Sequence, residues 1–316
     1  MTMREWVVIY LKGVCMGAAD IVPGVSGGTI ALITGIYDRL IAAIAALDPR
    51  VLADLPGVRS RSGRLRLREE LVTMDVPFLL VLGAGVGTAF LLMSRVIHAA
   101  FETYPAVLNG FFFGLIAASA VVIYRGIRVD TPGRVGALAF GAVLAFLVSG
   151  AAESGGSASL ALVFAAGAIA ISAMVLPGIS GAAFLYILGQ YQYMLGALTE
   201  LTNALVAVPE GGRLDAAIAP GIPVVVFLAG ATVGLLTMAR VVKRALERNR
   251  MATLGFLVGL MVGALRLPVE EAAAATEALT TSLLVAIVLA AVVGIVLILA
   301  FDRYGEPLDY TEDTAI

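Results

Sequence analysis

The chain has 316 residues, of which 60% are hydrophobic and 14% are charged, and its formal net charge is -2. Soluble domains are typically about 45–50% apolar and about 25% charged, so this composition excludes an ordinary soluble protein and predicts an integral membrane protein. A single cysteine, Cys15, and a single histidine, His98, exclude an internal disulfide and a zinc site built from several such ligands. We expect no metal, no cofactor and no nucleic-acid partner.

The first apolar segment, about residues 5–47, is interrupted by a break around a Pro-Gly pair. The break consists of Val22, Pro23, Gly24, Val25, Ser26, Gly27, Gly28 and Thr29. Proline removes a backbone donor and disfavours helix before it, whereas serine is a preferred N-cap. We therefore predict that one helix stops here and another starts at Ser26. A re-entrant hairpin that enters and leaves the membrane on the cytoplasmic side fits this pattern.

The polar segment 48–75 is the most basic loop of the chain. It contains Arg50, Arg59, Arg61, Arg64, Arg66 and Arg68. The positive-inside rule places it in the cytoplasm, and with it the N-terminus. Three spanning helices should follow, at about 76–94, 106–124 and 135–150. The basic loop between the last two also falls inside.

The second half of the chain shows the same order of features. A hairpin at about 160–198 is predicted to enter from outside, with its break at Leu176, Pro177, Gly178, Ile179, Ser180 and Gly181. Spanning helices should follow at about 221–239, 252–267 and 281–300. The loop between the first two is basic and falls inside, the acidic loop after the second falls outside, and the tail 303–316 is cytoplasmic.

Two sets of matching residues indicate an internal repeat. The two prolines are 154 residues apart (177 − 23), and Gly85, Arg95, Gly110 and Gly114 recur 145 residues later as Gly230, Arg240, Gly255 and Gly259. Repeat 1 covers 1–152 and repeat 2 covers 158–302, each with one hairpin and three spanning helices. Because three crossings is an odd number, the second copy should be inverted. The predicted fold is an all-α polytopic membrane protein with an inverted-topology repeat.

The two breaks predict a site for an anion. A helix N-terminus presents unpaired N–H groups and the positive end of the helix dipole, and glycine lets a ligand approach the backbone. Two such ends that meet near the midplane would bind an anion such as phosphate. The candidate residues are Gly24, Val25, Ser26, Gly27, Gly28, Thr29, Gly178, Ile179, Ser180 and Gly181. The alternative is that each motif only makes a tight break for helix packing.

Four ionisable residues flank the first break: Lys12, Asp20, Asp38 and Arg39. Ionisable groups at membrane depth are functional candidates by default. Lys12 could neutralise a bound phosphate, and Asp20 could pair with Lys12 or Arg39 or carry a coupling proton. The structural alternatives are mutual neutralisation of Lys12 and Asp20 and an interfacial pair of Asp38 and Arg39. The second hairpin has no equivalent charges.

These motifs together resemble the bacterial polyprenyl-phosphate transporter family, long catalogued as a membrane domain of unknown function. The resemblance rests on Lys12-Gly13, on Met16 to Asp20, on the two breaks, and on Gly35-Ile36-Tyr37 with Gly189-Gln190-Tyr191. It covers nearly the whole chain. It implies a flippase that returns undecaprenyl phosphate, or a related polyprenyl phosphate, from the outer to the inner leaflet of the bacterial plasma membrane for the synthesis of envelope polymers. Ala182 and Ala183 depart from the pattern, because a polar residue would be expected there.

Two other classes stay open as alternatives. One is a secondary transporter of a small soluble anion, and the other is a membrane phosphatase for polyprenyl diphosphate. Such a phosphatase would need an arginine beside the serine, whereas Gly27 follows Ser26 and Gly181 follows Ser180. We therefore predict no enzymatic activity and no catalytic residues. Coupling to protons or sodium, and assembly into a homo-oligomer, stay open.

Overall fold

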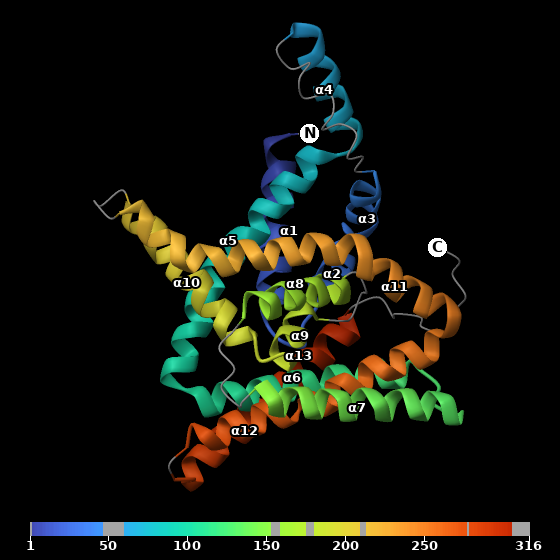
Figure 1. Ribbon diagram of the computed structural model, residues 1–316, viewed down its shortest axis with the longest axis vertical. Helices are drawn as coiled ribbons and strands as arrows, with labels where there is room; N and C mark the ends of the chain where they lie inside the picture. Colours follow the sequence, from blue (N-terminus) through green and yellow to red (C-terminus); the bar gives the residue numbers. More distant parts are fainter. Residues whose placement is uncertain are drawn as a thin grey trace.

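The computed structural model describes residues 2–46, 60–152, 159–174, 180–208, 213–276 and 278–304. Every regular element in these ranges is a helix (Figure 1). Five helical stretches in them are long and apolar enough to cross a membrane: Val76–Thr103, Pro105–Arg125, Leu214–Leu235, Arg248–Ala274 and Thr281–Arg303. The protein is therefore a polytopic, all-helical membrane protein, as its composition predicts.

The first Pro-Gly motif interrupts the helical chain where the sequence predicts it. The helices around it are α1 (Met3–Asp20), α2 (Gly27–Ile33) and α3 (Tyr37–Ala45). The chain leaves α1 before Pro23 and starts α2 directly after Ser26. Gly24 between them has a φ of 88°, and a Cβ on it would lie 3.0 Å from the backbone of Leu115. Position 24 therefore requires glycine, because a side chain would be strained at this positive φ and would be too close to Leu115.

The segment predicted as a basic loop contains a helix. Ser60 caps α4 (Arg61–Thr73) by accepting a hydrogen bond from the backbone N–H of Gly63 at 3.0 Å. Asp75 then adopts a left-handed conformation, which separates α4 from α5 (Val76–Thr103). Figure 1 shows α4 projecting from the helical body. The structure also extends the predicted spanning helix 76–94 by nine residues, to Thr103.

The central helices agree with the predicted order. They are α6 (Pro105–Arg125), α7 (Pro132–Ala152), α8 (Leu160–Met174), α9 (Gly181–Ile187) and α10 (Tyr191–Ala207). The second break separates α8 from α9, and most of it, residues 175–179, lies outside the described part of the chain.

The two predicted helices, 221–239 and 252–267, lie in two helical arms that a kink at Asn249 separates. A short 3-10 turn (Leu214–Ala217) leads into α11 (Ile218–Ala264), whose regular backbone is interrupted at Asn249. The Asn249 side chain accepts a hydrogen bond from the N–H of Ala252 at 3.0 Å, so it caps the second arm. The chain reverses direction at this bend (Figure 1). The last helices are α12 (Arg266–Ala274) and α13 (Thr281–Tyr304).

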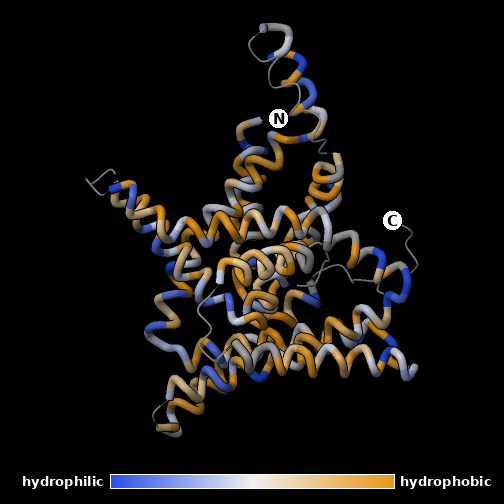
Figure 2. Tube along the Cα trace, viewed as in Figure 1, coloured by the Kyte–Doolittle hydropathy of each residue, from blue (hydrophilic) through white to orange (hydrophobic). Residues whose placement is uncertain are grey.

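Glycines let the helices pack closely in pairs. α1 packs on α5, α8 on the first arm of α11, α6 on α13, and α7 on α11. At each crossing a Cβ on glycine would overlap the neighbouring backbone, as at Gly85, Gly230, Gly114 and Gly259. Small residues at crossings are typical of membrane helices, because they let the backbones approach. Hydrophobic residues dominate along the paired helices, and hydrophilic residues gather on α4 and at the peripheral turns (Figure 2).

One buried hydrophobic cluster contains an aromatic group that joins both halves of the chain. Phe101 and Phe112 come from α5 and α6, and Tyr186 and Tyr191 from α9 and α10. The Phe112 ring makes edge-on contacts with Tyr186 and Tyr191, with ring centroids 5.8 Å apart in each pair. The cluster therefore ties α9 and α10 to the first half of the chain.

Candidate functional site

Ser180, which directly follows the undescribed part of the second break, lies beside the first break in the folded protein. The backbone carbonyls of the first break accept hydrogen bonds from side chains that are distant in sequence. Tyr191 donates to the Ile21 carbonyl at 2.6 Å, Ser119 to that of Gly24 at 2.6 Å, and the Ser180 hydroxyl lies 3.5 Å from that of Val22. Irregular backbone at membrane depth needs such partners, because lipid supplies none.

The N-terminus of α2 already holds an internal carboxylate. Asp20, at the end of α1, is 4% exposed, and its Oδ1 accepts a hydrogen bond from the N–H of Gly27 at 2.7 Å. Its Oδ2 is buried and has no hydrogen-bond partner among the described residues. A Cβ on Gly27 would overlap this carboxylate. The N-terminus of α2 thus has a hydrogen-bond acceptor, a carboxyl oxygen that the protein itself supplies.

Lys12 lies at the opposite end of the same short helix. Its Nζ donates to the carbonyl of Thr34, one residue beyond α2, at 2.5 Å. Lys12 and Asp20 are eight residues apart on α1 (20 − 12), or about 12 Å at the usual helical rise, and the seven residues of α2 span about 10 Å. Lys12 and Asp20 therefore bracket α2, with the ammonium group at its C-terminus and the carboxyl group at its N-terminus. Both complement the helix dipole.

Arg39 binds a residue that the sequence analysis did not select. Its guanidinium makes two hydrogen bonds to Asp75, at 2.6 and 2.9 Å, and lies 4.1 Å from the ring centre of Phe78. Planar, bidentate recognition of a carboxylate is the geometry that arginine favours. The interaction joins α3 to the start of α5. The side chain of Asp38 lies outside the described part of the structure.

The second break is described only from Ser180 onward, so Gly178 and Ile179 are not placed. Ser180 is 2% exposed and caps α9, because its hydroxyl accepts a hydrogen bond from the N–H of Ala183 at 3.3 Å. Gly181 is the first residue of α9. Ser180 thus has two roles, because it caps α9 and also lies beside the first break.

Several residues at this site were not singled out from the sequence. Ser119 is an isolated serine in an apolar helix, and Tyr191 enters the sequence analysis only as part of the family resemblance. Both are buried, at 5% and 4% exposure. An isolated hydroxyl in a membrane helix is the signal that could have selected Ser119, because a buried hydroxyl needs a partner.

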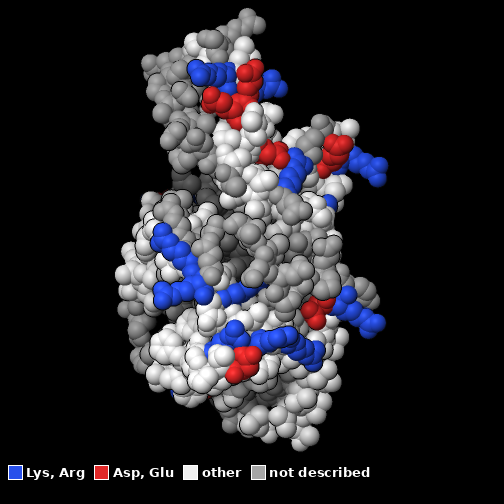
Figure 3. All heavy atoms as spheres, turned by 90° about the vertical axis from the view of Figure 1, so that its right-hand side faces the viewer, with Lys and Arg blue, Asp and Glu red and all other residues white. Residues whose placement is uncertain are grey.

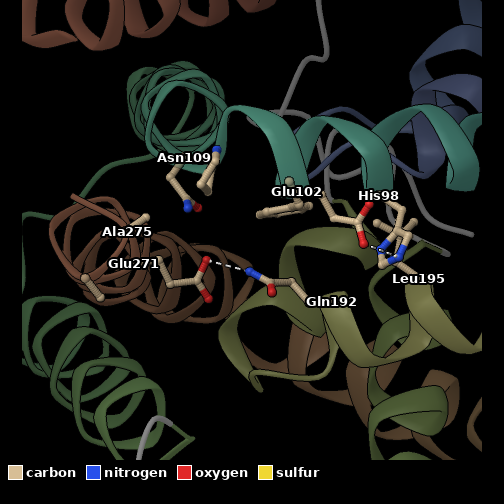
Figure 4. A pocket seen from close by; sticks show the side chains of 10 residues that line it. His98, Glu102, Asn109, Gln192, Leu195, Glu271 and Ala275 are labelled. Carbon is tan, nitrogen blue, oxygen red and sulfur yellow. Dashed lines mark hydrogen bonds and ion pairs between the residues drawn. The ribbon is translucent and has the colours of Figure 1, made fainter. Parts of the chain in front are cut away.

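A cavity of about 490 Å³ lies apart from the breaks, between α5, α6, α10 and α12 (Figure 4). Glu271 of α12 points toward Gln192 of α10, whose amide nitrogen donates to its Oε2 at 2.9 Å. The same oxygen is 3.2 Å from the hydroxyl of Tyr186, and that hydroxyl donates its single hydrogen to Asn109 Oδ1 or to Glu271. Both halves of the chain therefore contribute to this cavity.

Comparisons with known proteins place the chain among membrane transporters. The sequence model of a family described as VCA0040-like, undecaprenyl phosphate translocase-like, matches residues 16–282. A polyprenyl-phosphate transporter of Vibrio cholerae is 37% identical over 256 residues, which cover 81% of this chain and 75% of that protein. A polyprenyl-phosphate transporter of Staphylococcus aureus is 28% identical over 278 residues, which cover 84% and 86% of the two chains. No solved structure matches the chain.

Proposed function

Because the chain belongs to the undecaprenyl phosphate translocase-like family, we propose that the meeting point of its two helix breaks is where the lipid phosphate crosses the membrane. The activity itself follows from the family and from the 37%-identical relative: the protein translocates polyprenyl phosphate, and it is a transporter, not an enzyme. The proposed direction is from the outer to the inner leaflet of the bacterial plasma membrane, which recycles the carrier lipid.

An inverted repeat is part of this proposal, and the helix crossings support it. A Cβ on Gly85 would overlap the backbone of Tyr10, and one on Gly230 would overlap that of Phe164. The two glycines are 145 residues apart (230 − 85), and their partners are 154 apart (164 − 10). These are the two offsets that define the repeat in the sequence. The close approach of α1 to α5 thus has a counterpart in that of α8 to α11.

The other pair of crossings supports the repeat independently. Gly114 of α6 lies against Ala291 of α13, and Gly259 of α11 lies against Leu138 of α7. The glycines are again 145 residues apart (259 − 114), and the partners are 153 apart (291 − 138). In this arrangement the third spanning helix of each half packs on the second spanning helix of the other half: α13 packs on α6, and α7 packs on the second arm of α11. Crossed packing of this kind suits two copies related by an axis in the membrane plane.

The distribution of charge supports the proposed orientation, with both termini in the cytoplasm. The connection between α6 and α7 and the bend of α11 lie on one side of the molecule (Figure 1). Figure 3 shows that side, where Lys and Arg side chains gather across the middle and lower part of the face. Exposed basic residues in these two connections include Arg125, Arg128, Arg244 and Arg248. Under the positive-inside rule this face is cytoplasmic.

The proposed phosphate site comprises Ser26, Gly27 and Gly28 of the first break with Ser180 and Gly181 of the second. The observation that carries it is the contact between the breaks, in which Ser180 lies 3.5 Å from the Val22 carbonyl. Asp20 now uses the N–H that a phosphate oxygen would take. A bound phosphate must therefore displace Asp20 from Gly27 or share the site with its neutral form, because two unscreened anions at one buried donor repel each other.

The test is a translocation assay in liposomes that contain a labelled polyprenyl phosphate. A phosphatase confined to the outside reports how fast the lipid phosphate changes leaflets. We expect protein-dependent exchange that Gly27→Val abolishes, because valine would displace Asp20 and fill the donor site. Gly136→Val is the matched control, since a side chain at Gly136 meets open space. If a folded Gly27→Val variant exchanges the lipid at an unchanged rate, the first break is not the phosphate site.

A further inference from the structure

Arg95 is a charged residue within a membrane-spanning helix. The predicted helix 76–94 stops just before it, which would leave Arg95 at the membrane surface. In the structure α5 continues for eight residues beyond Arg95 (103 − 95), or about 12 Å at the usual helical rise. We propose that Arg95 receives the phosphate of the lipid from the outer leaflet and holds it at the depth of the first break. This inference rests on the proposed function, which places the C-terminal end of α5 on the outer side.

Arg95 has no counter-ion among the residues that the structure describes. Its side chain is only partly buried, yet its Nε is enclosed and has no hydrogen-bond partner there. None of the ion pairs in those residues includes it. The one carboxylate of α5, Glu102, is seven residues away (102 − 95), and its Oε1 lies 3.5 Å from His98. Ionisable groups at membrane depth usually pair with another group, so the chemistry of this position calls for an anion.

The packing of α1 on α5 shows the depth of Arg95. A Cβ on Gly13 would lie 3.2 Å from the Cα of Gly85, and one on Gly17 would lie 3.0 Å from the Cβ of Ala89. Both pairs are 72 residues apart (85 − 13 and 89 − 17), so the two helices run in the same direction. At the same offset Arg95 is level with position 23 (95 − 72), inside the first break and just beyond the end of α1.

The surface around Arg95 suits an anion that has a hydrocarbon tail. Leu91, Leu92 and Ala99 are its neighbours on one face of α5, because they lie three or four residues away. All three are exposed, the leucines at 40% and 55%. Exposed apolar side chains on a spanning helix contact lipid in the membrane. A lipid phosphate can therefore reach Arg95 sideways with its tail in hydrocarbon, whereas a soluble anion on this side would have to leave water.

Anchoring at the outer surface is the structural alternative for Arg95. A long cationic side chain near a helix end can extend its charged group toward the interface. On α5, however, the Cα–Cβ bonds tilt toward the N-terminus, which is the cytoplasmic end in the proposed orientation. The enclosed Nε also shows that the side chain lies against the protein. Both features favour a guanidinium that faces the membrane interior.

The guanidinium of arginine matches a phosphate monoester. Such a group has three acceptor oxygens and a charge of about −1.5 to −2 at neutral pH. The planar fork of arginine binds two such oxygens at once and keeps its charge in apolar surroundings. The phosphates of ordinary phospholipids are diesters, which carry less charge and a second substituent. A compact monoester can therefore move down to Arg95, from which the helix ends of the proposed site are at the same depth.

The first measurement tests binding in detergent, without transport. The thermal unfolding midpoint is followed as polyprenyl phosphate, phosphatidylglycerol or inorganic phosphate is added, since a bound ligand stabilises the folded state. We expect polyprenyl phosphate to raise the midpoint most, and Arg95→Gln to need about tenfold more of it, because a charged hydrogen-bond donor is lost. Arg95→Lys should recover part of the affinity. Arg125→Gln, at an exposed arginine in the last turn of α6, is the control and should bind like the wild type.

Several results of this measurement would overturn the assignment. One is equal affinity in a folded Arg95→Gln variant, and another is an equal loss in Arg125→Gln. Phosphatidylglycerol that binds through Arg95 as tightly as polyprenyl phosphate would make the residue a general contact for lipid headgroups. Inorganic phosphate that does so would indicate a site for a soluble anion.

The second measurement separates this inference from the proposed function. Lipid exchange is followed in liposomes over a range of polyprenyl phosphate contents. We expect Arg95→Gln to slow exchange most at low lipid content and least near saturation, whereas Gly27→Val abolishes it throughout. Exchange in Arg95→Gln that equals the wild-type rate at low lipid content contradicts the inference alone. Wild-type protein that binds polyprenyl phosphate through Arg95 but moves none of it contradicts the proposed function instead.

Discussion

At the scale of single residues, the first break depends on one carboxylate and the glycine that faces it. Asp20 gives the N-terminus of α2 a hydrogen-bond acceptor, and Gly27 leaves the space for it. A buried N–H without a partner costs about 1–3 kcal/mol. The pair therefore stabilises a helix of seven residues that would not persist alone.

Substitutions of two glycines should have opposite effects on stability. Gly27→Ala is expected to lower the free energy of unfolding by about 1–3 kcal/mol, because its Cβ would overlap Asp20. Gly83→Ala, at an open position inside α5, should raise it by about 0.5–1 kcal/mol. Thermal unfolding in detergent measures both. Equal midpoints for the two variants would show that the carboxylate does not occupy the space beside Gly27.

Arg39 and Asp75 give a second prediction at this scale. Arg39→Lys should lower stability by about 1 kcal/mol, because lysine keeps the charge but loses the paired hydrogen bonds and the contact with Phe78. The control is Arg66→Lys, whose ion pair with Glu70 is long and more exposed. A loss in the control as large as that in Arg39→Lys would mean that the bidentate geometry contributes nothing.

At the scale of helices, the crossings are set by glycines that recur at fixed offsets. Gly114→Ala and Gly259→Ala occupy equivalent places in the proposed repeat, and each new Cβ would overlap a backbone carbonyl of the partner helix. We expect both variants to be destabilised to a similar degree, by about 1–3 kcal/mol. Gly87→Ala, where a side chain meets open space, is the control. A large difference between Gly114→Ala and Gly259→Ala would argue against equivalent crossings.

The order of helices could be predicted from the sequence, because proline, glycine and runs of apolar residues determine where membrane helices stop and start. The interruption before Ser26 and the helix that starts after it are examples. The length of the first arm of α11, which continues to Arg248, could not be predicted in this way. Residues 240–248 are polar enough to resemble a loop, but they are good helix formers, and only Asn249 departs from helical geometry.

The side-chain partners at the site were harder to predict than the helices. The sequence predicts that Lys12 neutralises a phosphate and that Asp20 pairs with Lys12 or Arg39 or carries a coupling proton. It does not predict that each lies at one end of α2. That arrangement depends on the direction in which α2 folds back along α1, which no local pattern specifies. Arg39 likewise binds a residue 36 positions away (75 − 39), beyond the reach of helical periodicity.

At the scale of the whole molecule, the proposed orientation can be tested by labelling. Cys15 is exposed, so it is first replaced by alanine. In that background Arg128→Cys lies in the basic connection after α6, and Leu279→Cys, at a position 69% exposed, lies between α12 and α13. In intact cells a membrane-impermeant thiol reagent should label Leu279→Cys and not Arg128→Cys. The reverse labelling pattern would show the opposite orientation in the membrane and would contradict the proposed direction of transport.

The hydrogen bond between Tyr191 and Ile21 can form only late in biosynthesis, because its donor is synthesised long after its acceptor. The carbonyl of Ile21 leaves the ribosome 170 residues before its donor (191 − 21), which at about 5–20 residues per second is a delay of roughly 10–30 s. Ser180, which lies beside the Val22 carbonyl, is synthesised almost as late as Tyr191. Ser119, the donor to the Gly24 carbonyl, is synthesised earlier. During that interval the first break holds carbonyls whose final donors do not yet exist. Until the second half of the chain is synthesised, these carbonyls must therefore accept hydrogen bonds from water or from the insertion machinery.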